Sequence, residues 1–268
     1  MSKLHILSAY RVFTLTKYYF ICSFRNISRV LLIAIWPIID LIIWGFTASY
    51  FGQTQVSVNP FVGIILSSII FWTLTIKAQQ EISCQFMDDV YSRNFSNLIT
   101  SPITSFELIL SLTLSNLIKL QLVFFSLLAS STVFFSFNLF NYNRFVAIYA
   151  IINLIIFGWV LGITAIALII RFGYRLEVFA WSLSIFIQPV SCVFYPRSIL
   201  PEPLKILSFL NPISYVFEEF RGLINNNSYS IDKLHIATLI NIIYIIGASI
   251  LFVIMLNQAR KKGSLLRL

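Results

Sequence analysis

Long apolar runs separated by short polar stretches make up most of the chain. A transmembrane helix needs about 20 mostly apolar residues. Six segments meet this condition, at residues 30–51, 60–76, 120–138, 145–170, 178–195 and 235–258. We therefore expect an all-α integral membrane protein with six transmembrane helices, in which residues 30–258 form one transmembrane domain. Six crossings place both termini on the same side of the membrane.

The first 29 residues follow a different pattern. At about 100° per residue, all of their basic side chains fall within an arc of about 120°. Apolar side chains such as Phe13, Phe20 and Ile27 occupy the opposite side, together with Val12 and Tyr19. This pattern predicts an amphipathic helix over residues 1–29 that lies on an anionic membrane surface, rather than a solvated charged tail. The basic residues are Lys3, Arg11, Lys17, Arg25 and Arg29.

Prolines interrupt the chain between the fifth and sixth apolar segments. Each proline removes a backbone donor, so an unbroken helix cannot pass through this region. Asn211 and Pro212 form a cap and a first helical position, and the apolar residues that follow recur at helical spacing. We therefore expect a re-entrant helical segment at residues 196–224, outside the membrane or entering its outer leaflet. The prolines are Pro189, Pro196, Pro201, Pro203 and Pro212, and the apolar positions are Ile213, Val216, Phe217, Phe220 and Ile224.

The composition agrees with a membrane protein. Hydrophobic residues make up 58% of the chain and charged residues 11%, whereas about a quarter of the residues of a soluble domain are charged. The net charge of +9 does not indicate nucleic-acid binding. Most Lys and Arg residues, including those of the basic tail at residues 259–268, lie on one side of the membrane in the six-helix arrangement. The positive-inside rule then predicts cytoplasmic termini, and we expect a plasma-membrane location, the inner membrane of a bacterial cell.

Motifs for catalysis and nucleotide binding are missing from the sequence. It contains no G-x-x-x-x-G-K-[ST] loop for ATP phosphates, no G-x-S-x-G elbow and no H-E-x-x-H pair. Cys22, Cys84 and Cys192 are isolated, and His5 and His235 lie far apart. We expect no enzymatic activity, no metal site and no cofactor bound by this chain itself.

Two stretches carry a resemblance to a known family. The first comprises Pro196, Pro201, Asn211, Pro212, Tyr215 and Arg221, and the second covers residues 71–107 with Ser101-Pro102 and Glu107. With these residues in this order, the chain resembles the ABC-2 type transporter permeases, the membrane subunits of ABC exporters.

The resemblance implies a permease subunit that forms the transmembrane conduit of an ATP-driven exporter. Its partners would be membrane lipids, a second copy of itself and a separate ATPase subunit that binds ATP-Mg. The cytoplasmic segment 78–105 would contain the helix that couples to the ATPase, unless it is only a solvated loop. The residues expected in this coupling role are Glu81, Gln85, Asp88, Asp89 and Arg93.

The outer segment would form the external gate. Glu218 and Arg221 are spaced for contact on one side of a helix, and this pair would either hold the gate closed or only fix the helix at the interface. Pro196, Pro201, Asn211, Pro212 and Tyr215 belong to the same motif. The substrate is left open between a polysaccharide, a lipid-linked glycan, a lipid and a drug.

Two ionisable residues fall inside or next to apolar segments. Asp40 lies within the first one, where an ionised carboxylate costs about 2.5 to 3.5 kcal/mol. It is expected to face the bundle interior, to be protonated or to find a partner, and it either lines the conduit or makes a helix-packing hydrogen bond. Lys119 is expected to mark the cytoplasmic start of the third span and to extend its side chain to the interface.

The alternative function is a secondary transporter or channel that works without an ATPase. Such proteins place broken helices and ionisable residues near the middle of the bilayer. In this sequence the breaks cluster at one outer loop, and Asp40 is the candidate charge at mid-depth. A neighbouring reading frame with a Walker A motif would favour the exporter.

Overall fold

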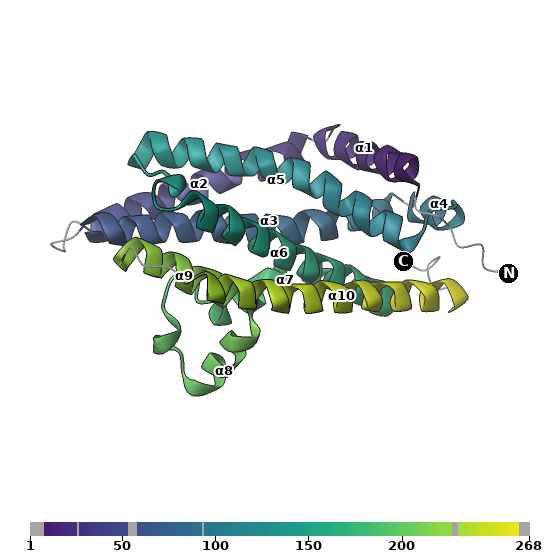
Figure 1. The fold of residues 1–268 in the computed structure, drawn as a ribbon. Helices are drawn as coiled ribbons and strands as arrows, with labels where there is room; N and C mark the ends of the chain where they lie inside the picture. The colour runs from purple at the N-terminus through teal and green to yellow at the C-terminus, as the bar shows by residue number, and fades with distance from the viewer. Residues whose placement is uncertain (1–7, 26, 53–57, 93, 227–229, 263–268) are drawn as a thin grey trace.

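The computed structural model describes residues 8–25, 27–52, 58–92, 94–226 and 230–262 (Figure 1). Within these ranges the regular structure is helical, and no strand occurs. The all-α prediction is therefore confirmed for the described chain. The helices are α1 (Ala9–Arg25), α2 (Ile27–Gly52), α3 (Val58–Tyr91), α4 (Asn94–Thr100), α5 (Ser105–Phe135), α6 (Arg144–Phe172), α7 (Val178–Ile187), α8 (Glu202–Leu210), α9 (Pro212–Asn226) and α10 (Ile231–Lys262).

Five of these helices, α2, α3, α5, α6 and α10, are long and apolar enough to cross a membrane. They correspond to five of the six expected segments. The expected span at residues 178–195 is instead the 10-residue helix α7, followed by the 3-10 turn η3 (Gln188–Val190). Helix α3 has 34 residues and is about 51 Å long, against about 30 Å for the hydrocarbon core. It therefore extends well beyond the 60–76 segment expected from hydropathy.

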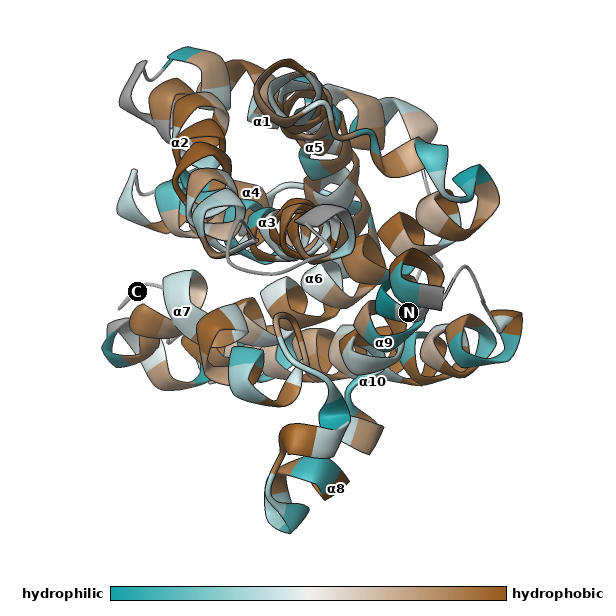
Figure 2. Ribbon diagram, turned by 90° about the vertical axis from the view of Figure 1, so that its left-hand side faces the viewer, coloured by the Kyte–Doolittle hydropathy of each residue, from teal (hydrophilic) through white to brown (hydrophobic). Residues whose placement is uncertain are grey.

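Apolar side chains cover much of the outside of the bundle. Only 22% of the apolar window of α10 and 28% of that of α2 are buried. In the end-on view of Figure 2, the long helices are predominantly brown, the colour of hydrophobic residues. A soluble monomer rarely exposes apolar patches of this extent. The five long helices are thus compatible with an integral membrane protein.

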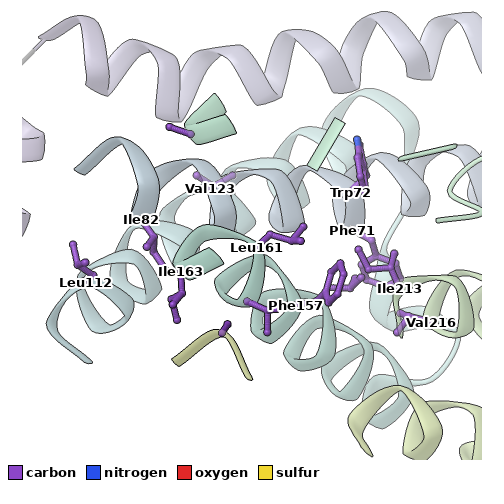
Figure 3. Packing of buried hydrophobic residues seen from close by; sticks show 14 of the residues in the cluster. Phe71, Trp72, Ile82, Leu112, Val123, Phe157, Leu161, Ile163, Ile213 and Val216 are labelled. Atoms are coloured by element: carbon purple, nitrogen blue, oxygen red, sulfur yellow. The ribbon is translucent and has the colours of Figure 1, made fainter. Parts of the chain in front are cut away.

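Helix α3 lies at the centre of the bundle, in contact with α2, α5, α6, α7 and α9. Its closest neighbour is α6, because Gly158 and Gly162 face it without side chains. A Cβ atom at Gly158 would lie 2.4 Å from the Cβ atom of Ala78, so this approach requires glycine. Beside this contact the buried apolar residues form a continuous core, part of which is drawn in Figure 3.

Helices α6 and α10 run in the same direction. Asn153 of α6 bonds to Thr238 and Asn241 of α10, and Phe157, one turn further along α6, contacts Tyr244. The chain that links the end of α6 to the start of α10 must therefore run back along the bundle. Helices α7 and α9 are the two parts of this return. Both pack along α3, and α8 projects from the side of the bundle between them (Figure 1).

Helix α1 corresponds to the central part of the amphipathic helix expected at residues 1–29, of which residues 1–7 lie outside the described chain. Its buried side, which includes Val12, Leu15 and Tyr19, packs mainly against α5. Phe13 and Phe24 are exposed. The tail expected at residues 259–268 is described only through Lys262, as the end of α10.

Candidate functional site

The segment between α7 and α10, which we call the outer segment after the location expected for it, is organised around Asn211. The backbone N–H of Ile213 donates to Asn211 Oδ1 at 3.1 Å, and α9 begins at Pro212 as predicted. Asn211 Nδ2 donates to Ser191 Oγ at 2.9 Å, which ties the start of α9 to the end of the α7 segment. Pro196 precedes the 3-10 turn η4 (Arg197–Ile199), and Pro201 directly precedes α8.

The apolar side of α9 is buried in the bundle. Ile213, Val216, Phe217, Phe220 and Ile224 all lie in the core, and the Phe220 ring meets the Phe71 ring of α3 edge to face at 4.7 Å. Such aromatic pairs add about 0.5 to 1.5 kcal/mol beyond the burial of their area. This side of α9 holds the second half of the return against α3.

Glu219, next to Glu218 in the sequence, has partners of its own. It is buried, and its carboxylate accepts the backbone N–H of Ser230 and lies 3.3 Å from Lys233 Nζ. Its role is to join the end of α9 to the start of α10.

The expected contact between Glu218 and Arg221 is present. Arg221 Nη1 lies 3.3 Å from Glu218 Oε1, one helical turn away. Arg221 Nη2 also donates to the carbonyl oxygens of Cys192 at 2.9 Å and Val193 at 3.1 Å. Cys192 has a left-handed backbone conformation, with φ of 55°. Arg221 therefore clamps the turn that follows α7, a contact that the helical spacing alone did not reveal.

Arg197 is a second cation of this segment that the sequence analysis did not single out. Its guanidinium carbon lies 4.2 Å from the centre of the Phe209 ring and 4.6 Å from that of Tyr215. Its Nη2 donates to Ser214 Oγ at 2.6 Å, and its backbone N–H donates to Glu218 Oε1 at 2.7 Å. Glu218 thus accepts hydrogen bonds from both arginines. Arg197 could have been identified from the sequence, because it is a charged residue directly after Pro196 in a mostly apolar segment.

At the other end of the bundle, the residues expected to couple to an ATPase lie on α3. Asp88 is exposed, whereas Glu81, Gln85 and Asp89 are buried. Arg93 lies outside the described residues. A buried side chain cannot itself contact a partner subunit, so Asp88 is the described member of this set that is placed to do so.

Lys119 lies at the centre of a buried polar cluster, which we call the inner charge cluster. It is completely buried, and its Nζ lies 2.9 Å from Glu81 Oε2 and 3.2 Å from both Gln85 Oε1 and Ser23 Oγ. Gln85 Nε2 donates to the carbonyl oxygen of Tyr19 at 2.8 Å. The expectation that Lys119 extends to the interface is therefore wrong, because Glu81, Gln85 and Ser23 provide its partners inside the bundle. The cluster connects α1, α3 and α5.

Asp89 forms a smaller polar group with α1 and α4. Tyr18 Oη donates to Asp89 Oδ1 at 3.1 Å, and Asn94 Nδ2 donates to the same oxygen at 3.2 Å. Burial, and secondarily the negative charge of Asp89, raises the pKa of Tyr18 above its ordinary value. The phenol is therefore neutral at physiological pH and remains a donor to the carboxylate.

Glu107 fixes the start of α5. Its side chain and that of Thr104 form a reciprocal capping box. The carboxylate also accepts the backbone N–H of Ser8 at 2.9 Å and lies 3.8 Å from Arg11 Nη1. The beginning of α1 is thereby attached to the turn between α4 and α5, which contains Ser101 and Pro102.

Asp40 occupies the middle of α2 at intermediate exposure. It hydrogen-bonds to Trp36 on its own helix and interacts electrostatically with Lys77 of α3. It therefore has partners, which is one of the three alternatives expected for this carboxylate. Its role in lining a conduit remains a prediction.

The described residues contain no group of three or more His, Cys, Asp and Glu side chains that could hold a metal ion. A comparison of the sequence with protein-family models finds no match. A comparison with curated proteins finds no match either.

Proposed function

We propose that the chain is the permease subunit of an ATP-driven exporter of the ABC-2 type, with six membrane crossings and cytoplasmic termini. The observation that supports this most is the divided return between the parallel helices α6 and α10. In the proposal α7 and α9 together make the fifth crossing, and α8 enters the outer leaflet as the re-entrant element. The broken, proline-rich segment between the last two crossings is one of the two stretches on which the family resemblance rests.

The outer segment acts as the external gate in this proposal. The clamp of Arg221 on Cys192 and Val193 joins α9 to the turn after α7. Releasing it would let α8 and α9 move relative to α7 while the five long helices keep their packing. Gating thus requires exchange of a few hydrogen bonds at one end of the bundle.

The opposite end provides the ATPase contact in the proposal. Helix α3 extends past the apolar segment by about 20 Å and is followed by the short helix α4. Asp88 is exposed and lies three residues before the end of α3. This end of α3 and α4 lie near the end of the bundle at which α1 begins and α10 ends (Figure 1). Two copies of the chain would form the conduit, each contacting one ATPase subunit.

Purification from native membranes in a mild detergent tests this proposal. We expect a stoichiometric partner that carries a Walker A motif and an export activity that requires ATP hydrolysis. Mutation of the Walker A lysine of that partner should abolish export and leave the complex assembled. Export by the purified chain alone, driven by an ion gradient, would overturn the proposal.

A secondary transporter is the second candidate, and one observation favours it. Lys119 and Glu81 are ionisable groups buried among long apolar helices, and such groups mark ion pathways in many transporters. In proteoliposomes a secondary transporter would respond to an imposed proton or sodium gradient without ATP.

A further inference from the structure

A cavity of about 440 Å³ lies between α1 and the segment formed by α4 and the turn before α5. This volume is typical of small-molecule sites, about 300 to 1,000 Å³. Leu15 lines it from α1, and Leu98 and Ile103 line it from the opposite wall. Arg11 and Asn94 supply polar groups to an otherwise mostly apolar lining.

The surface of α1 can be divided into three sectors around the helix axis, one of which faces this cavity. One sector, with Val12 and Tyr19, is buried against the bundle, and a second carries exposed phenylalanines, including Phe13 and Phe24. The third sector contains the basic residues of the helix. At about 100° per residue, this basic sector coincides with the helix face that lines the cavity.

Cations therefore border the cavity along α1. Lys17 and Arg25 are exposed, and Arg11 is itself part of the lining. Arg11 Nη1 donates to the carbonyl oxygen of Pro102 at 2.6 Å and lies 3.8 Å from Glu107 Oε2. A guanidinium has five N–H donors, so Arg11 has further donors for a ligand.

We propose that this cavity binds an anionic phospholipid, with an acyl chain between α1 and α4 and the phosphate beside Arg11 and Lys17. The apolar walls require a hydrocarbon chain, and the cationic border selects a negative headgroup. The exposed Phe13 and Phe24 place the lipid interface along the neighbouring sector of the same helix. This inference requires a membrane-embedded chain but not a partner ATPase, so it can fail or succeed independently of the exporter proposal.

Thermal unfolding of the purified protein in detergent tests the headgroup. Dioctanoyl phosphatidylglycerol should raise the unfolding temperature at lower concentration than dioctanoyl phosphatidylcholine, and soluble glycerol phosphate should have no effect. Lys17→Gln should weaken the apparent affinity for phosphatidylglycerol about fivefold, as expected for one cation near a lipid phosphate. Lys205→Gln, which removes a partly exposed cation on α8 that pairs with Glu202, is the control and should bind as the wild type does. Equal affinities for the two lipids would overturn the proposal.

A second pair of variants tests the cavity itself. Thr14 lines the cavity at an exposed position of α1, and its neighbour Phe13 does not line it. Thr14→Trp should occupy the space and lower the affinity for phosphatidylglycerol at least tenfold, whereas Phe13→Trp should not. Unchanged lipid affinity in a folded Thr14→Trp protein would overturn the assignment. So would loss of a copurifying protein partner from this variant with the lipid response intact, which would assign the cavity to that partner.

Discussion

Charged side chains have different kinds of partner in the inner charge cluster and in the outer segment. In the inner charge cluster, Lys119 of α5 is surrounded by side chains from two other helices, and the pair of Lys119 and Glu81 is almost fully enclosed. In the outer segment, Arg221 and Glu218 are more exposed, and the remaining bonds of the guanidinium go to backbone carbonyls of a turn. The inner charge cluster joins the helices α1, α3 and α5. The bonds of Arg221 instead join the short helix α9 to the turn after the short helix α7.

This difference indicates which of the two regions can change conformation more easily. A lysine in a dry interior cannot lose its carboxylate partner without a large cost, because the remaining charge stays buried. A partly exposed guanidinium can exchange a carbonyl for water at a smaller cost. We therefore expect the inner charge cluster to be rigid and, in the proposed exporter, the outer segment to be the part that changes conformation.

The largest expected effect is at Lys119. Lys119→Met removes the ion-pair partner of the buried Glu81, which keeps its electrostatic interaction with Lys77, and should lower the free energy of unfolding by up to about 3 to 5 kcal/mol. Denaturant unfolding of the purified protein in detergent measures this. Combining Lys119→Met with Glu81→Leu should recover most of the loss, because neither charge remains. If Lys119→Met alone unfolds as the wild type does, the inner end is not held by this pair.

A smaller loss of stability is expected at the outer clamp. Arg221→Ala should cost about 1 to 3 kcal/mol, since Glu218 and two carbonyls lose a donor. The variant should insert and assemble but export less, or hydrolyse ATP without export. Arg221→Lys keeps the charge without the planar fork. Its free energy of unfolding should lie between those of the wild type and Arg221→Ala. Loss of assembly in Arg221→Ala would favour a purely anchoring role, and full export with normal coupling would contradict both roles.

Arg197 should affect α8 more than the whole fold. Arg197→Leu removes the cation between Phe209 and Tyr215, worth about 0.5 to 2 kcal/mol. Hydrogen exchange measured by mass spectrometry should become faster in residues 202–210 and remain unchanged in α3. Uniformly faster exchange would instead indicate that Arg197 supports the bundle as a whole.

The smallest effect on stability should come from Asp88. Asp88→Lys changes an exposed position, and the free energy of unfolding should shift by no more than about 0.5 kcal/mol. Copurification of the proposed ATPase should nevertheless weaken. Asp89→Lys is the matched comparison, and it should reduce stability because it places a cation at a buried position beside Tyr18. Unchanged copurification in a stable Asp88→Lys protein would remove this position from the ATPase contact.

The sequence by itself determined the helical class, five of the long helices and the start of α9. The apolar runs are long enough to identify helices without tertiary information, because their length and composition are local properties. Asn211 and Pro212 likewise act through their own backbone and side-chain chemistry. For the same reason, helical spacing identified the apolar side of α9 and predicted that Glu218 contacts Arg221.

Tertiary structure alone decided where the polar residues of α3 and α5 lie. Glu81, Gln85 and Asp89 have the spacing of an exposed polar face, and they are buried because α1 and α5 supply partners to that face. Ser23 and Lys119 are 96 residues apart in the chain, so no local pattern could reveal their contact. The prolines divide the chain between α7 and α9, but packing decided where the two short helices lie, because each is held along α3 by contacts that exist only in the assembled bundle.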